Sequence, residues 1–332
     1  MYERILVPLD GSKLAQQALP YARSVASAKS AEVELLEVIA PLEELPKPDV
    51  DDYAAVGAGT RSGPWPAPDE WPPIAEHYRN RAWLQLADSA TMLGDGVKVS
   101  SKVLEGDAAE AIIAEADRQP GTLIVMATHG RSGLGRWLLG SVADKVVRHA
   151  NHPTLVVRAR EDADGTPAMI GEVILPLDGS ATAEAAIPHA VEMSKLLGVG
   201  ISLLRAVSPA SHADAFVEYM PDSYERLVEE AREDAEEYLD GVATRIRDQG
   251  ISEVRTEASI GNASSAIVDL ARAAENPLVV MATHGRSGVR RWVLGSVVDR
   301  VVRRGPGPVL VVRPVEAASR RDMGWGHSVP PL

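Results

Sequence analysis

The chain has 332 residues, a formal net charge of -13 and no cysteine. Its length suits two domains of roughly 100–200 residues each. The negative charge disfavours nucleic acid and anionic membrane surfaces as partners, because binding to either requires a basic face. Without cysteine the chain has no disulfide framework, no thiolate metal site and no cysteine nucleophile.

We expect neither a targeting segment nor a membrane span in this sequence. Its first residues, MYERILVPLDGS, lead directly into a predicted strand and lack the apolar region of a signal peptide. No uninterrupted apolar run approaches the roughly 20 residues that cross a bilayer. We therefore expect a cytoplasmic protein.

Short runs of valine, isoleucine and leucine alternate with longer amphipathic segments along the whole chain. The patterns predict strands at 4–9, 32–39, 97–104, 122–127 and 154–158, and again at 172–177, 201–207, 253–259, 277–282 and 309–313. They predict helices near 13–29, 73–93, 107–117, 140–149, 181–197, 221–248, 262–274 and 295–304.

Several of these strands are apolar throughout, as in TLIVMA at 122–127, which indicates a parallel sheet covered on both faces. Alternation of strands and helices implies right-handed crossovers. The expected fold class is therefore α/β, with two repeated doubly wound domains, each a mainly parallel five-stranded sheet flanked by helices.

The repeat is visible in the letters of the sequence. Residues 126–158 aligned with 281–313 give 33 positions, of which 23 are identical, and both segments begin MATHGRSG. A second pair, VPLDGS ending at Ser12 and LPLDGS ending at Ser180, matches near the start of each half. The predicted organisation is a first domain over 1–158, a linker over 159–171, a second domain over 172–314 and a flexible tail over 315–332.

The first half is longer between its second and third predicted strands. Asp10 aligns with Asp178 at an offset of 168, whereas Gly106 aligns with Gly261 at an offset of 155, so the first half holds 13 extra residues there. That region, 41–72, contains seven prolines and is expected not to form a regular helix. It is either a lid or docking loop for an unknown protein partner, or a tolerated surface insertion.

The chemistry-bearing pattern is A-T-H-G, then nine residues, then G-S. It runs from Ala127 to Ser141 and again from Ala282 to Ser296. Each copy follows an apolar strand, and ligands of doubly wound sheets lie outside the carboxyl ends of the strands. Glycines leave backbone amides free to approach phosphate oxygens, and a helix N-terminus favours an anion. The serine hydroxyl can donate to a phosphate or cap the helix.

These segments resemble the universal stress protein family in a tandem two-domain form. ATP-binding members of that family carry G-x-x-G, nine residues and G-[S/T] after the fourth strand, and both halves keep this spacing with alanine in place of the first glycine. The resemblance covers about residues 1–158 and 170–314. It implies an adenine nucleotide alpha hydrolase-like fold whose last strands pair antiparallel across a pseudo-two-fold axis.

The resemblance further implies one adenine nucleotide, ATP, in each half, with Mg²⁺ bound through the phosphates. The aspartate after the first strand would contact the nucleoside, the end of the second strand would contact adenine, and the glycine loop with the helix start would hold phosphates. The implied residues are Pro8, Asp10, Val38, Ala127, Gly130, Arg131, Gly140, Ser141 and Val142, then Pro176, Asp178, Ala206, Ala282, Gly285, Arg286, Gly295, Ser296 and Val297.

Some of these residues have ordinary structural alternatives. A D-G-S sequence before a helix is also common capping chemistry, so Asp10 could serve its own turn. Arg131 and Arg286 either bind the polyphosphate or are simply solvated.

The expected function is a nucleotide-dependent stress-response switch or binding module. No P-loop lysine is present, and no obvious base is placed to activate water, so catalysis is not expected to be efficient. Two alternatives stay open: a slow Mg²⁺-dependent ATPase or nucleotidyl-transfer enzyme, and an interaction module with vestigial nucleotide sites. Two tandem chains could also associate into a homodimer.

Overall fold

The computed structural model describes residues 1–41, 71–128, 139–159, 169–207, 221–283 and 294–314. The predicted tail at 315–332, most of the linker at 159–171 and most of the loop at 41–72 lie outside these ranges.

Ten strands lie within two residues of their predicted bounds. The first half contributes β1 (Arg4–Leu9), β2 (Glu32–Ile39), β3 (Val99–Glu105), β4 (Thr122–Thr128) and β5 (Thr154–Arg158). The second half contributes β6 (Glu172–Pro176), β7 (Gly200–Val207), β8 (Val254–Ile260), β9 (Pro277–Ala282) and β10 (Val309–Val312).

The helices also follow the prediction, with one systematic exception. They are α1 (Lys13–Gln16), α2 (Leu19–Lys29), α4 (Trp71–Leu93), α5 (Ala108–Asp117), α6 (Ser141–His149), α7 (Ala181–Glu184), α8 (Ile187–Leu197), α10 (Pro221–Arg247), α11 (Ala263–Ala273) and α12 (Ser296–Arg304).

The exception is the first predicted helix of each half. The sequence predicts one continuous helix there, but the structure has two shorter helices. In the first half the break lies between Gln16 and Leu19, and Pro20 stands at the start of the second piece; Pro188 does the same in the second half. Proline has no amide hydrogen to donate to the preceding turn, so the helix restarts there. The loop prediction ending at 72 is also wrong at its edge, because α4 begins at Trp71.

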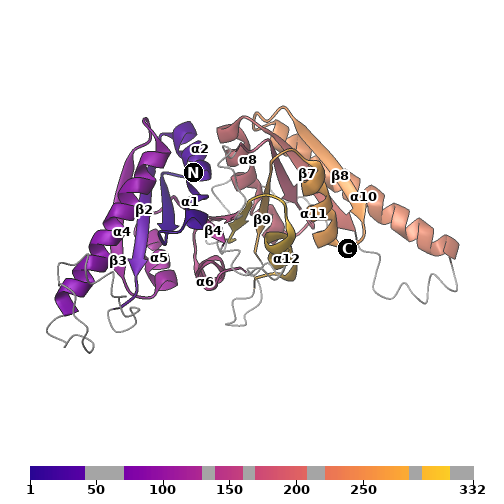
Figure 1. Ribbon diagram of the computed structural model, residues 1–332. Coiled ribbons are helices and arrows are strands. Elements are labelled where there is room, and N and C mark those ends of the chain that lie inside the picture. The colour runs from indigo at the N-terminus through magenta and orange to yellow at the C-terminus, as the bar shows by residue number, and fades with distance from the viewer. Residues whose placement is uncertain (42–70, 129–138, 160–168, 208–220, 284–293, 315–332) are drawn as a thin grey trace.

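All ten strands form one sheet in the order β3-β2-β1-β4-β5-β10-β9-β6-β7-β8 (Figure 1). Within each half every pairing is parallel. At the centre β5 and β10 pair antiparallel, with Leu155 opposite Leu310. The pairing of the two last strands that the resemblance implied is thus confirmed, and the two halves share one continuous sheet.

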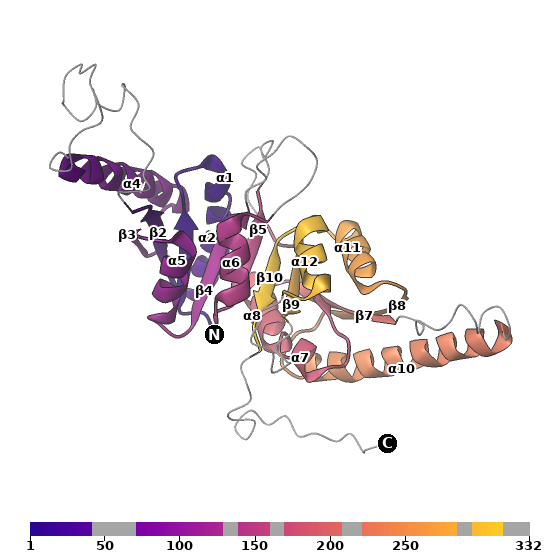
Figure 2. The ribbon, with the colours of Figure 1, turned by 90° about the horizontal axis from the view of Figure 1, so that it is seen from below.

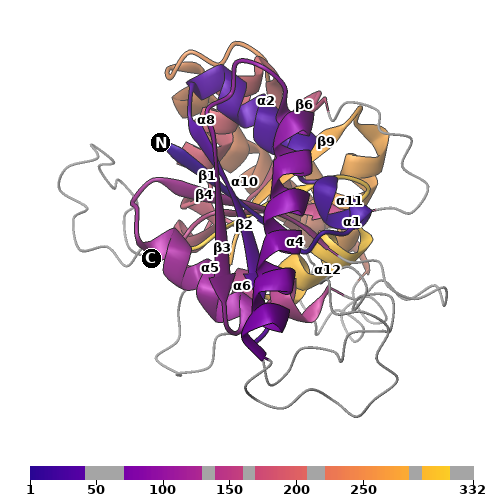
Figure 3. The same ribbon diagram turned by 60° about the vertical axis from the view of Figure 1, so that its left-hand side comes forward.

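Helices cover both faces of this sheet (Figure 2). Leu6 and Val7 show why the strands are apolar throughout: both are fully buried, yet they belong to different clusters on opposite faces. One cluster lies under α2, α4, α8 and α10, and the other lies under α5, α6, α11 and α12. Figure 3 brings α4 forward beside β2 and β3, which it contacts.

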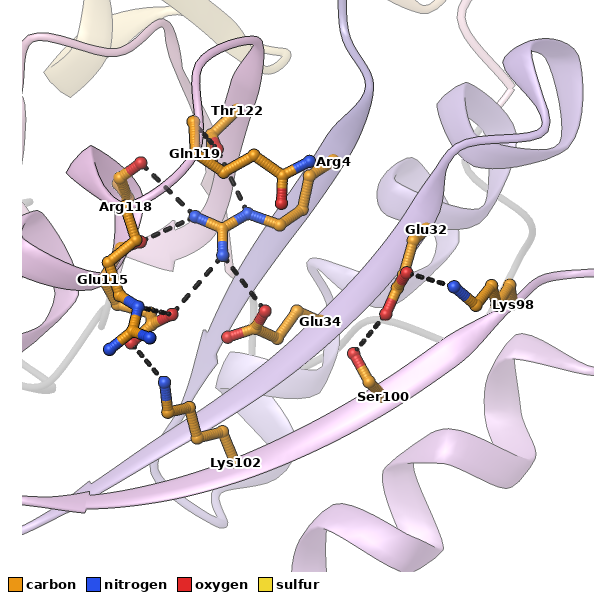
Figure 4. Close-up of polar contacts among 11 residues, drawn as sticks. Arg4, Glu32, Glu34, Lys98, Ser100, Lys102, Glu115, Arg118, Gln119 and Thr122 are labelled. Carbon is orange, nitrogen blue, oxygen red and sulfur yellow. Dashed lines mark hydrogen bonds and ion pairs between the residues drawn. The ribbon is translucent and has the colours of Figure 1, made fainter.

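The amino ends of the strands in the first half carry a buried polar network centred on Arg4 (Figure 4). Its guanidinium lies 3.1 Å from a Glu34 carboxylate oxygen and 3.4 Å from one of Glu115. Its Nε donates to the Thr122 hydroxyl at 3.1 Å, and its Nη2 donates to the Glu115 carbonyl at 2.6 Å. This network lies at the edge opposite to the strand ends that the motifs follow, so it holds the fold together and is not part of the candidate site.

Candidate functional site

A tight glycine turn follows the first strand of the first half. The Asp10 carboxylate accepts the Ser12 amide at 3.0 Å, and the Ser12 hydroxyl oxygen accepts the Ala15 amide at 3.1 Å as the N-cap of α1. Between them Gly11 has a φ of +73°, which L side chains rarely adopt. The capping chemistry considered for this segment is therefore present, and Asp10 is exposed at the carboxyl edge of β1.

The second half repeats this turn closely. The Asp178 carboxylate accepts the Ser180 amide at 2.9 Å, and the Ser180 hydroxyl oxygen accepts the Ala183 amide at 3.1 Å. Gly179 has a φ of +82°. Both aspartates thus occupy equivalent positions, each exposed just beyond a buried leucine.

The strand register brings the other predicted nucleoside residues to the same edge. Pro8 pairs with Leu36, so Val38 extends beyond β1 at the carboxyl end of β2, where it is half-buried. In the second half Pro176 pairs with Leu204, and Ala206 takes the equivalent half-buried position.

The alanines that replace the family's first glycine lie inside strands. Ala127 pairs with Val157 in β4–β5, and Ala282 pairs with Val312 in β9–β10. Neither has a positive φ. Extended backbone accepts any residue, so alanine imposes no strain at these two positions.

The helices that follow the two motifs begin at glycine N-caps. Gly140 is the N-cap of α6 and Gly295 is the N-cap of α12, and neither cap makes a side-chain hydrogen bond. Ser141 and Ser296 are the first helical residues, so the prediction that the serine could cap its helix is wrong. Their side chains are exposed, and Val142 and Val297 follow as half-buried residues.

Some other helices of the protein begin with a side-chain cap, although α2 and α8 do not. Asp107 caps α5 by accepting two amides at 3.0 Å, and Asn262 accepts an amide at the start of α11. At α6 and α12 the first amides have no such side-chain acceptor within the part of the chain that the structure describes. Free amides and the positive end of the helix dipole favour an anion at that position.

The rest of each glycine loop lies outside the described residues. Gly130, Arg131, Gly285 and Arg286 belong to it, so their predicted contacts are not placed. Further along the helices, Asp144 pairs with Arg148 at 2.7 Å and Asp299 pairs with Arg303 at 2.9 Å.

Sequence reasoning missed one pair of positions at this edge. Glu37 pairs with Leu9 in the register of β1 and β2, directly before Val38. Adding the offset of 168 places Arg205 at the equivalent position, directly before Ala206. A comparison of the two repeats by charge, in addition to identity, would have found this inversion.

Glu37 lies in an unfavourable environment for a negative charge. It is 8% exposed, and its Oε2 is buried with no hydrogen-bond partner among the described residues. Burial is the largest cause, the negative charge of Asp10 adds to it and Arg81 opposes both, and together they raise the pKa of the Glu37 carboxyl to about 7.

Arg205 lies in a very different environment. Its guanidinium carbon stands 4.8 Å from the centre of the Tyr238 ring, a cation–π geometry. A Cβ added at Gly179 would lie 3.4 Å from the Arg205 Nη2, so the cation lies against the turn that holds Asp178. In the first half the same turn meets a neutral residue, because a Cβ at Gly11 would clash with the Gln85 side chain at 2.5 Å.

The fold and the site define a tandem pair of doubly wound α/β domains. Each domain has an exposed aspartate turn at the carboxyl ends of its strands and a helix that begins at a glycine N-cap. The sequence profile of the Universal stress protein family matches residues 1–158 and 169–313. The chain belongs to this family in its tandem form.

The relatives cover either nearly the whole chain or about half of it. A universal stress protein of Mycolicibacterium smegmatis is 26% identical over 316 residues, which span 93% of this chain and 97% of the relative. One from Methanocaldococcus jannaschii is 33% identical over 159 residues, which span 48% of this chain and 83% of the relative. The crystal structure of a universal stress protein from Archaeoglobus fulgidus superposes with a TM-score of 0.65 at 20% identity, covering 94% of this chain and 99% of that one.

Two features are absent from the described residues. They contain no group of three or more histidine, aspartate or glutamate side chains placed to hold a metal ion. None of their helices is both long and apolar enough to cross a membrane.

Proposed function

We propose that this chain is an ATP-binding universal stress protein with one adenine-nucleotide site in each half, acting as a nucleotide-dependent switch or binding module. The observation that carries the proposal is the pair of helix starts at Gly140 and Gly295, whose first amides have no side-chain cap. Each follows the strand next to an exposed aspartate turn, at the edge where doubly wound sheets bind ligands.

The chemistry of each edge suits a nucleotide. Amides at the start of α6 and α12 would receive phosphate oxygens, with the Ser141 and Ser296 hydroxyls as further donors. Asp10 and Asp178 would accept hydrogen bonds from the ribose, and the strand ends at Val38 and Ala206 would face the base. The motif glycines Gly130 and Gly285, with Arg131 and Arg286, complete the proposed set.

Any Mg²⁺ in this proposal accompanies the phosphates. The described residues contain no cluster of side chains that could hold a cation. A cation held mainly by phosphate oxygens and water is the usual arrangement for Mg²⁺ with nucleotides. The cytoplasmic location expected from the sequence also stays part of this proposal.

Isothermal titration of the purified full chain tests the proposal. We expect nearly two ATP equivalents per chain for the unmodified protein, and about one when either Gly130→Val or Gly285→Val fills one motif loop. Asp107→Ala, which removes a helix cap away from both sites, is the matched control and should leave the stoichiometry unchanged. Absence of binding at millimolar ATP would refute the proposal.

Phosphate release measured on the same preparations separates a switch from a slow ATPase. A switch retains ATP intact through the titration. Release that disappears in the Gly130→Val and Gly285→Val double variant would instead assign turnover to these sites, whereas release that persists in it would indicate a contaminant.

A further inference from the structure

The two candidate sites differ most at one pair of aligned positions, Glu37 and Arg205. Both residues follow a fully buried leucine at the carboxyl end of the second strand of their half. Their side chains lie on the sheet face covered by α4 and α10, beside the aspartate turns. The first turn therefore faces a second carboxyl group, and the second turn faces a guanidinium.

The partners of these two side chains on the covering helices differ as well. In the second half Tyr238 of α10 holds the Arg205 cation, and the Tyr238 hydroxyl donates to Glu184 at 2.9 Å. In the first half the helix presents neutral Gln85 to the turn, and Arg81 is the cation that acts on Glu37. Arg81 is exposed, so water screens its charge.

Within the described residues, the groups that face Glu37 come from the turn after β1, from α4 and from the two neighbouring strands. The turn after β1 contributes Asp10, and α4 contributes Arg81. The neighbouring strands place apolar Leu9 and Val103 opposite Glu37 in the register. An ionised Glu37 would therefore stand beside a like charge with one oxygen unpartnered, whereas a protonated Glu37 would not.

We propose that Glu37 and Arg205 make the two nucleotide sites unequal: the first site binds polyphosphate ligands more weakly as pH rises through neutrality, and the second binds them with higher affinity and without this dependence. The inference rests on the proposed function of both sites. A ligand with several negative charges is repelled by an ionised Glu37 near Asp10 and attracted by a permanently charged Arg205 near Asp178. The pKa of Glu37, raised to about 7 by burial, places its charge change in the physiological range.

The expected size of the effect follows from proton linkage. If the ligand binds only the protonated first site, its affinity falls about tenfold between about pH 6 and about pH 8, and partial coupling gives a smaller change. The second site has no corresponding carboxyl, so its titration over the same range reports the pH dependence of ATP itself.

The experiment measures ATP affinity at both pH values in full-length Gly285→Val, which leaves the first site, and Gly130→Val, which leaves the second. Between the two pH values, the ATP affinity of the first site should fall by more than that of the second site. Adding Glu37→Gln should abolish this excess loss, whereas Glu32→Gln, the same change at the far end of β2, should not. Arg205→Gln should weaken the second site about three- to tenfold at both pH values.

The outcomes separate this inference from the proposed function. Equal pH dependence at the two sites, or an excess loss that survives Glu37→Gln, would overturn the inference while leaving nucleotide binding in place. The comparison of the two single-site proteins needs no Glu37 substitution. The inference can therefore be refuted even if the Glu37→Gln variant folds poorly. Lack of ATP binding in the unmodified chain would refute the proposed function itself.

Discussion

The Tyr2 hydroxyl lies 2.8 Å from His189 Nδ1, which joins the start of the first half to α8 of the second half. Tyr2 is 1% exposed, and nearby Glu192 receives the chain's terminal ammonium at 2.9 Å and the Lys29 ammonium at 3.0 Å. Because α2 packs against α8, this cluster joins the halves at a second place besides the central strand pair.

Acid should lower the free energy of unfolding because His189 is buried as a neutral ring. Burial lowers the pKa of His189 from 6.5 to about 4, so the folded chain leaves this ring neutral where the unfolded chain protonates it. Protonation therefore favours unfolding as pH falls from about 6.5 to about 4, at a cost of at most about 3 kcal/mol. Urea unfolding across this range should show a smaller loss for His189→Gln than for the unmodified chain. Equal losses would mean that His189 is protonated in the fold.

Weakening the central seam, the antiparallel pair of β5 and β10, should destabilise both halves together. Leu310 and Leu155 are fully buried and face each other in the antiparallel pair. Leu310→Ala should cost about 2–5 kcal/mol, because it removes buried methyl groups and leaves a cavity. Denaturant titration measures this loss, and Leu84→Ala, at a position 73% exposed on α4, is the control that should change little. A loss below about 1 kcal/mol for Leu310→Ala would contradict the role given to the seam.

Arg4 should be among the most sensitive polar residues of the first half. Removing it leaves the Glu34 carboxylate without its guanidinium partner, while the buried Glu115 carboxylate keeps Lys102 and Arg118. Breaking a buried ion pair costs about 3–5 kcal/mol. Lys98→Ala provides the contrast, because its ion pair with Glu32 is exposed on the lysine side and is worth about 0–1 kcal/mol. Thermal or urea unfolding of the two variants should differ accordingly, and equal losses would be inconsistent with a buried network.

Asp10 should separate turn stability from ligand binding. Asp10→Ala and Asp107→Ala each remove carboxylate-to-amide hydrogen bonds, so each should cost about 1 kcal/mol of stability. Only Asp10→Ala should weaken ATP binding, and it should do so at the first site alone. If both variants bind ATP like the unmodified chain, Asp10 serves its turn and does not contact the nucleoside.

The fold followed from local patterns wherever the controlling signal was local. Apolar runs placed all ten strands within two residues, because a strand buried on both faces needs continuous apolar residues. Pro20 and Pro188 signal the two helix breaks, but the amphipathic pattern continues across them, so a single helix was predicted in each half. Of the two roles offered for Ser141, only capping was wrong, since only the backbone geometry shows that the cap is Gly140.

The sequence by itself determined the repeat, the doubly wound fold class, and the edge of the sheet at which the aspartate turns and glycine motifs lie. Those features depend on spacing along the chain, and parallel strands bring their carboxyl ends to one edge. Only the tertiary structure decided what surrounds each charge. A glutamate near a strand end is usually solvated, but the packing of α4 over β2 buries Glu37, whereas Tyr238 of α10 holds Arg205 at the equivalent place. Burial and neighbouring charge set the protonation of such groups, and both arise from residues far apart in the sequence.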